Sequence, residues 1–145
     1  MKTIGIIAEY NPFHRGHEAQ LRTLRARFGE NCALAVALGG CFTQRGEAAV
    51  FTKYARAEAA IRCGADLVLE LPLPWAVSSA EGFARGGVGV LDAFGCGVLA
   101  FGSECADGEK LRRIALLTGD ERFPGLLREA LAGGTGFAAA RQKAL

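Results

Sequence analysis

Two histidines stand three residues apart in the stretch EYNPFHRGH (residues 9–17), which directly follows the apolar run TIGIIA. If a strand ends here and a helix begins, free backbone N–H groups and the positive end of the helix dipole attract an anion. Gly16 lets the backbone approach closely, and the imidazoles of His14 and His17 can donate to phosphate oxygens. The stretch predicts a phosphate cradle, although an H-x-x-H pair also fits histidines that only cap or pack.

A second polar segment, GGCFTQRGEAAVFTKYAR, carries Gln44, Arg45, Lys53 and Arg56. Its loop of about 14 residues is long for an α/β domain, which favours a functional role. From charge and position we predict that Lys53, with Arg45, assists at a phosphate or carboxylate group. The alternative is a solvated basic loop, and this is the interpretation we favour for Arg56, on the helix that follows.

Carboxylates at or near the predicted strands could hold Mg²⁺ or orient a substrate, but each alone fits a structural role; they are Glu9, Asp66, Glu70 and Glu104. A metal site made of His14, His17 and Cys41 has no ligand spacing to support it, so we predict no protein-bound metal.

Four apolar runs recur at intervals of about 30 residues, the length of a βα unit. They cover residues 3–9, 32–38, 65–71 and 97–101. Because each is apolar nearly throughout, the runs predict parallel strands covered on both faces. The fold class is therefore α/β, a doubly wound parallel sheet flanked by helices, and its ligand is expected at the carboxyl ends of the strands.

Helical periodicity lies between these runs. The expected core-facing stripes are His17, Leu21, Leu24 and Phe28 in the first helix, Tyr54, Ala57 and Ile61 in residues 53–63, and Ala80, Phe83, Ala84, Val88 and Leu91 in residues 77–94. The third helix also contains glycines 82, 86, 87 and 89, each of which weakens a helix by roughly 1 kcal/mol. We attribute them to close packing on the sheet.

The pattern changes after residue 105, where three helical segments follow without a strand signal. Asp107 is the expected N-cap of the first, and Gly119 its end. We assign 1–105 to a ligand-binding α/β domain and 106–145 to a helical segment, which is either an appendage or the start of a truncated remainder.

Composition narrows the class of protein. Half of the 145 residues are hydrophobic, which argues against disorder, and the net charge of +2 neither demands nor excludes a nucleic-acid partner. No run approaches the roughly 20 apolar residues of a membrane span, and the N-terminus lacks signal-peptide features. The five cysteines include no C-x-x-C pair, which favours reduced thiols in a cytoplasmic protein.

The motif HRGH after an apolar strand resembles the nucleotidyltransferase superfamily of Rossmann-like folds. Four longer strings are more specific: GIIAEYNPFHRGH, GGCFTQRGEAAVFTKYARAEAAIRCGADLVLELP, SSAEGFARGGV and FGSE. Together with ARQKAL at the end, they resemble the tRNA(Met) cytidine acetate ligase family along essentially the whole chain.

This resemblance implies an enzyme that uses ATP to convert acetate to acetyl-adenylate, with release of pyrophosphate. The acetyl group then passes to the exocyclic amine of the wobble cytidine of elongator tRNA(Met). Residues 1–105 become the ATP-binding domain, and ATP is expected to bind with Mg²⁺. The expected ATP-binding residues are Ile7, Ala8, Glu9, Tyr10, Asn11, Pro12, Phe13, His14, Arg15, Gly16, His17, Glu18, Ala19, Gln20 and Gly102, and the expected catalytic residues are His14, His17 and Lys53.

Members of that family are much longer and carry a downstream Ser/Thr-Arg phosphate-binding motif, which residues 106–145 do not supply. We therefore expect this chain to be an N-terminal portion that is inactive by itself. Two alternatives stay open: a small-molecule adenylyltransferase, and a nucleotide-binding module without catalysis.

Overall fold

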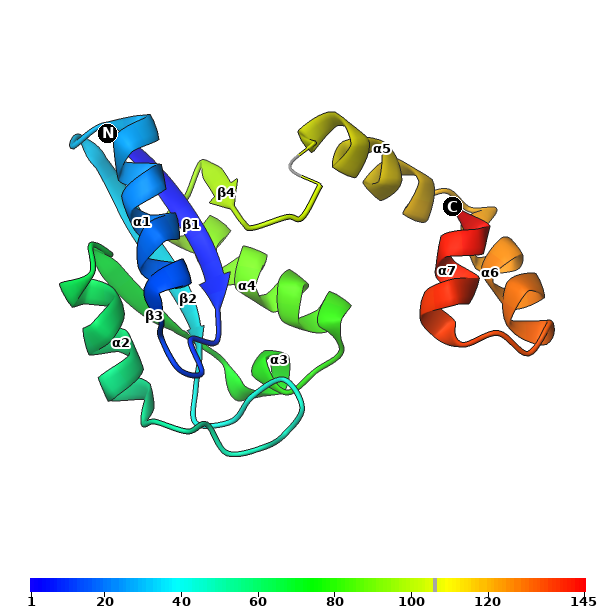
Figure 1. Ribbon diagram of the computed structural model, residues 1–145, viewed down its shortest axis with the longest axis horizontal. Coiled ribbons are helices and arrows are strands. Elements are labelled where there is room, and N and C mark those ends of the chain that lie inside the picture. The colour runs from blue at the N-terminus through cyan, green and yellow to red at the C-terminus, as the bar shows by residue number, and fades with distance from the viewer. Residues whose placement is uncertain (106) are drawn as a thin grey trace. The chain divides into compact units, whose positions relative to one another are not determined.

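The computed structural model describes residues 1–105 and 107–145 (Figure 1). The chain divides into two compact units, Met1–Gly102 and Ser103–Leu145. Residue 106, where the helical segment was predicted to begin, lies outside the described residues.

A four-stranded parallel sheet forms the centre of the first unit. The strands are β1 (Lys2–Ala8), β2 (Cys32–Gly39), β3 (Leu67–Leu71) and β4 (Val98–Ala100), in the order β3-β2-β1-β4. All four predicted strands are therefore confirmed. From β1 the chain moves outward to β3 and then returns to the other side of β1, so the strand order reverses between β1 and β4. Parallel sheets commonly bind ligands at the carboxyl ends beside such a reversal.

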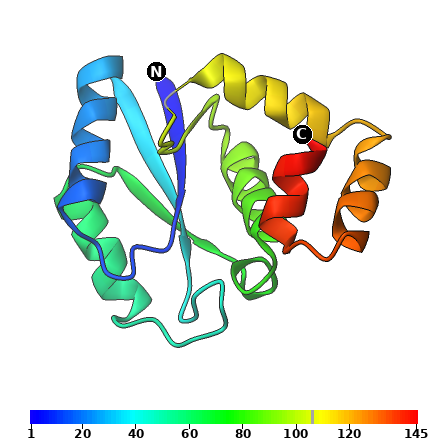
Figure 2. The same ribbon diagram turned by 45° about the vertical axis from the view of Figure 1, so that its right-hand side comes forward.

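Helices cover both faces of this sheet, as predicted (Figures 1 and 2). Helices α1 (Arg15–Phe28) and α2 (Lys53–Arg62) cover one face, and α4 (Ala80–Phe94), with the short α3 (Leu73–Ala76) packed on it, covers the other. Alternation along the strands explains the division, because successive side chains point to opposite faces. Ile4 and Ile6 pack with Leu21 of α1, whereas Ala35 and Ala37 pack with Leu91 of α4.

Two glycines let α4 approach its neighbours closely. A Cβ at Gly87 would lie 2.7 Å from Cδ1 of Ile7 on β1, and one at Gly86 would lie 2.4 Å from Cβ of Trp75. The predicted close packing is thus confirmed at Gly87, and Gly86 packs closely against α3. The predicted packing on the sheet is wrong at the other three glycines: Gly86 meets Trp75, Gly82 meets Ser78, and a Cβ added at Gly89 meets nothing within 4 Å. In the predicted stripe of this helix, Leu91 is buried but Val88 is exposed.

The predicted core-facing stripe of α2 is wrong at Tyr54 and Ile61, whereas Ala57 does pack against the core. Tyr54 is 75% exposed and Ile61 44% exposed, whereas Arg56 is only 2% exposed and Ala60 is fully buried. The expectation that the Arg56 side chain is solvated is therefore also wrong. Apolar periodicity cannot detect a buried guanidinium that is stabilised by hydrogen bonds, and each of the three side-chain nitrogens of Arg56 donates to a backbone carbonyl.

The second unit consists of three helices: α5 (Gly108–Thr118), α6 (Phe123–Ala132) and α7 (Phe137–Ala144). The side chain of Asp107 caps α5 by accepting from Lys110 N, and Gly119 is its C-cap, as predicted. Helix α6 packs against α7, where Ala130 and Ala140 are buried. Across residues 1–105 and 107–145, no helix is long and apolar enough to cross a membrane.

Candidate nucleotide site

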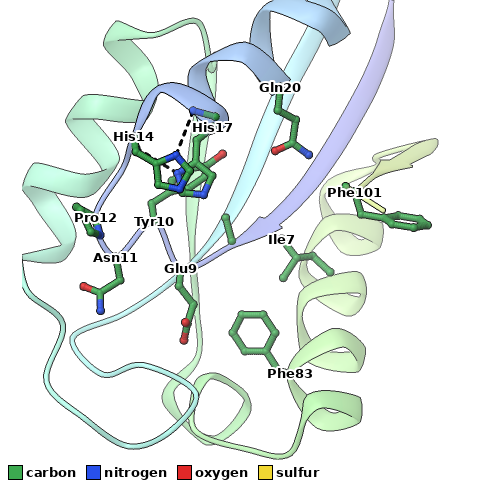
Figure 3. Close-up of a pocket in the computed structure, with 13 residues that line it drawn as sticks. Ile7, Glu9, Tyr10, Asn11, Pro12, His14, His17, Gln20, Phe83 and Phe101 are labelled. Carbon is green, nitrogen blue, oxygen red and sulfur yellow. Dashed lines mark hydrogen bonds between the residues drawn. The ribbon is translucent and has the colours of Figure 1, made fainter. Parts of the chain in front are cut away.

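A cavity of about 700 Å³ opens at the carboxyl end of the sheet, where the strand order reverses. We call it the β1–β4 cavity. Figure 3 shows His14 and His17 where the β1–α1 loop meets α1, and Phe83 and Phe101 on the side of α4 and β4. The lining residues all belong to the first unit: Ile7, Ala8, Glu9, Tyr10, Asn11, Pro12, His14, Gly16, His17, Gln20, Phe83, Phe101 and Gly102.

Tyr10 gives the β1–α1 loop a fixed shape. Its φ of 47° lies in the left-handed region, which costs a non-glycine residue roughly 1 kcal/mol or more. Packing holds the residue there, because the ring is 2% exposed and lies 4.9 Å from Phe13 and 4.6 Å from His17, centroid to centroid. Burial also raises the pKa of Tyr10 to about 12, so its hydroxyl stays neutral. The loop therefore rests on the core and presents its polar residues to the cavity.

His14 and His17 occupy the two positions of a capping box at the start of α1. His14 is the N-cap, and its Nδ1 accepts from Gly16 N at 3.1 Å. His17, at N3, accepts in turn from His14 N through its own Nδ1 at 3.3 Å. The two rings stack at 3.7 Å between centroids. The sequence leaves a phosphate cradle and a simple cap as alternatives for this pair, and in the structure both histidines cap α1 and also line the cavity.

The capping bonds decide which imidazole nitrogen carries a proton. Since each Nδ1 accepts from a backbone N–H, the proton of a neutral ring is assigned to Nε2. Burial, and secondarily the nearby His14, lowers the pKa of His17, which favours the neutral ring. The site therefore contains two imidazole N–H donors at a helix N-terminus, the kind of place where phosphate groups bind.

The β2–α2 loop, residues 40–52, is bonded to the β1–α1 loop. The Glu9 carboxylate accepts from Gln44 N, and Asn11 Oδ1 accepts from Val50 N at 2.7 Å. Glu9 and Asn11 both line the β1–β4 cavity. The long second loop thus supports the first, while its Arg45 is exposed.

Lys53 lies outside the β1–β4 cavity. Its Nζ is 2.6 Å from Glu70 Oε2, in a separate hollow of about 220 Å³ between α2 and β3, and this hydrogen bond raises the pKa of Lys53. Asp66 accepts from Arg25 and from Leu34 N, both at 2.7 Å. Glu70 and Asp66 thus pair with other groups of the fold, which agrees with the structural role expected for each carboxylate. Among the described residues, no group of three or more His, Cys, Asp or Glu side chains is placed to hold a metal ion.

Most of the residues predicted to bind ATP line the cavity, and four do not. Phe13 packs in the core instead, while Arg15, Glu18 and Ala19 lie on α1 outside the lining. Sequence reasoning did not assign Phe83 or Phe101 to the site. Phe101 stands at the end of a predicted strand, next to Gly102, and this position could have placed it in the site. Phe83 gives no such signal, because its spacing predicts a core-facing position on its helix.

The HIGH Nucleotidyl Transferase family matches the chain over residues 1–145. The chain belongs to this family. The HIGH motif of the name corresponds to HRGH, residues 14–17, of which His14, Gly16 and His17 line the β1–β4 cavity.

Relatives and solved structures agree with this assignment to the HIGH nucleotidyl transferases. The tRNA(Met) cytidine acetate ligase of Syntrophotalea carbinolica is 48% identical over 149 residues, covering 99% of this chain and 34% of that protein. The Bacillus subtilis protein of the same name is 41% identical, with 97% and 34% covered. Thermotoga maritima TmcAL, in a crystal structure with alpha-thio ATP, superposes with a TM-score of 0.87 at 44% identity, covering 99% of this chain and 35% of that one.

These matches confirm the predicted resemblance and the predicted fold class. The chain spans about a third of the length of the curated relatives it matches.

Proposed function

We propose that this chain is the ATP-binding part of a tRNA(Met) cytidine acetate ligase. The observation that carries the proposal is the pair of imidazole N–H donors at the start of α1, in a cavity beside the strand-order reversal. The names of the relatives point to acetate and tRNA(Met) as substrates, and the resemblance of the sequence specifies the elongator tRNA(Met). Residues 1–105 are proposed as the ATP-binding domain.

The cavity has one polar and one apolar side, which suits a nucleotide. His14 and His17 would donate to the phosphates from their Nε2 atoms, and the α1 dipole would add positive potential. Ile7, Phe83 and Phe101 would contact the adenine base and keep water from it. Gly102 and the lining part of Ile7–Gln20 complete the proposed site, and Mg²⁺ would enter with the triphosphate.

The chemistry then needs no protein nucleophile. A carboxylate oxygen of acetate attacks the α-phosphorus of ATP, the bond from that phosphorus to the bridging oxygen breaks, and pyrophosphate leaves with the electron pair. The cytidine amine next attacks the acetyl carbonyl, AMP leaves, and the amine loses a proton. Donors fixed by the capping box would stabilise the charge on the phosphate oxygens without reorganising. Lys53, paired with Glu70, stays a predicted helper.

The test is a calorimetric titration of the chain with Mg-ATP, beside the double variant His14→Ser/His17→Ala. Ser is a good N-cap, so the start of α1 keeps a cap while both imidazole N–H donors are removed. We expect saturable binding by the unchanged chain and at least about tenfold weaker binding by the variant, because a hydrogen bond to a charged group is worth about 1.5 kcal/mol or more.

Equal affinity of the two folded proteins would contradict the role of the imidazoles. A folded chain that takes up no Mg-ATP would contradict the proposal for these residues alone. Where binding occurs, acetate-dependent exchange of labelled pyrophosphate into ATP, measured on the chain and on a longer homologue, separates a ligase from a binding module.

A further inference from the structure

One arginine on α2 is buried at the ends of two strands. Arg56 is 2% exposed, although the sequence predicts a solvated side chain. Burial lowers the pKa of its guanidinium, and the nearby Cys41 and Glu9 partly offset this lowering. Arg56 does not line the β1–β4 cavity. A buried cation outside the cavity lining needs another reason for its place.

The three donor nitrogens of Arg56 bond three backbone carbonyls from three different places in the chain. Nη1 donates to Glu9 O, just past the end of β1, and Nη2 donates to Gly40 O, just past the end of β2. Nε donates to Phe51 O at 3.1 Å, near the start of α2. One planar group therefore fixes the start of the β1–α1 loop and both ends of the β2–α2 loop.

Side chains of the first loop continue this connection. Glu9 and Asn11 accept from the backbone amides of Gln44 and Val50 in the second loop. The two loops are thus joined by hydrogen bonds to each other and to Arg56. Two residues of the first loop, Glu9 and Asn11, also line the cavity. His14 lies only three residues beyond Asn11, at the end of the same loop.

We propose that Arg56 is a positioning residue for the nucleotide site: its guanidinium holds the β1–α1 and β2–α2 loops together and thereby sets where His14 and His17 stand. This inference rests on the proposed nucleotide binding for its effect on ligand affinity. Lysine cannot replace it, because a single ammonium nitrogen does not reproduce three donors spread over a rigid plane.

The first measurement is Mg-ATP affinity in the 145-residue chain and its Arg56→Lys variant, which keeps the charge. The matched control is Arg62→Lys on the same helix, where the guanidinium is exposed and pairs with Glu58. We expect Arg56→Lys to bind at least about tenfold more weakly, since small displacements of a binding constellation are costly, and Arg62→Lys to bind as the unchanged chain does. Unchanged affinity in Arg56→Lys overturns the proposal.

The second measurement needs no ligand. Amide hydrogen exchange, read by NMR, should accelerate in Arg56→Lys at Gln44 and Val50, whose N–H groups bond the first loop, but not at Val36 in the centre of the sheet. The imidazole resonances of the stacked His14 and His17 should shift with them. Faster exchange at Val36 as well would reduce Arg56 to a general contribution to stability and overturn the proposal.

The two measurements separate failure of this inference from failure of the proposed function. If the unchanged chain binds no Mg-ATP, nucleotide binding by these residues fails, and exchange still decides the role of Arg56. Acceleration confined to Gln44 and Val50 then sustains its positioning of the two loops, and unchanged exchange at both residues rejects it.

Discussion

The two ring nitrogens of His14 and of His17 have different roles. The Nδ1 atoms cap α1, and the Nε2 atoms stay free to donate. In the usual capping box the first residue is Ser or Thr and the second is Glu or Gln, neither of which leaves a ring N–H donor over. Histidine at both positions therefore caps the helix and still offers a ring N–H donor, which is the group that the proposed phosphate binding requires.

The lowered pKa of His17 predicts a pH-dependent stability. Because its value in the folded chain lies below the ordinary 6.5, the unfolded chain binds a proton there more readily, and the free energy of unfolding should fall as the pH drops below 6.5. Urea unfolding followed by the fluorescence of Trp75, the only tryptophan in the sequence, measures this at about pH 7.5 and about pH 5.5.

His17→Gln is the matched control, since glutamine keeps the N3 acceptor but does not titrate. The free energy of unfolding of this variant should fall less between the two pH values than that of the unchanged chain. An equal fall in both proteins would show that other groups cause the pH dependence.

At the scale of elements, α4 offers a pair of glycines with opposite surroundings. Alanine at Gly89 meets open space and should raise the free energy of unfolding by up to about 1 kcal/mol through helix propensity. Alanine at Gly87 gains the same propensity but places a methyl group 2.7 Å from Ile7 Cδ1. Overpacking costs about 1–3 kcal/mol, so Gly87→Ala should be destabilising overall.

Denaturant unfolding of the two variants checks this directly, with Trp75 as the reporter for the first unit. Because Ile7 also lines the β1–β4 cavity, Gly87→Ala should weaken Mg-ATP binding while Gly89→Ala leaves it unchanged. Stabilisation by both substitutions would mean that α4 shifts away from β1 at little cost.

The elements could be predicted from the sequence because apolar runs and periodicity are local signals. The strands followed from them, and the helix start at Asp107 was predicted from a capping residue in front of a periodic segment. The buried face of α2 could not be predicted, since the partners of Arg56 lie up to 47 residues away in the chain. For the same reason the pairing of Lys53 with Glu70, and the place of Phe83 on the cavity wall, required the folded sheet.

At the scale of the whole molecule, the division into two units bears on where nucleotide binding resides. Every residue that lines the β1–β4 cavity lies within Met1–Gly102, and the last of them is Gly102 itself. The hydrogen bonds that hold the two loops together also join residues of this unit alone. All the described residues that line this cavity therefore precede the helical unit.

We accordingly predict that a chain of residues 1–102 folds and binds Mg-ATP with an affinity similar to that of residues 1–145. A chain of residues 1–100 is the matched control, because it keeps β4 (Val98–Ala100) but lacks Phe101 and Gly102 at the cavity wall. Calorimetry should show weaker binding by 1–100 alone, with similar circular dichroism for both short chains. If 1–102 is folded but binds no better than 1–100, residues beyond Gly102 contribute to the nucleotide site, and the cavity of the first unit is only part of it.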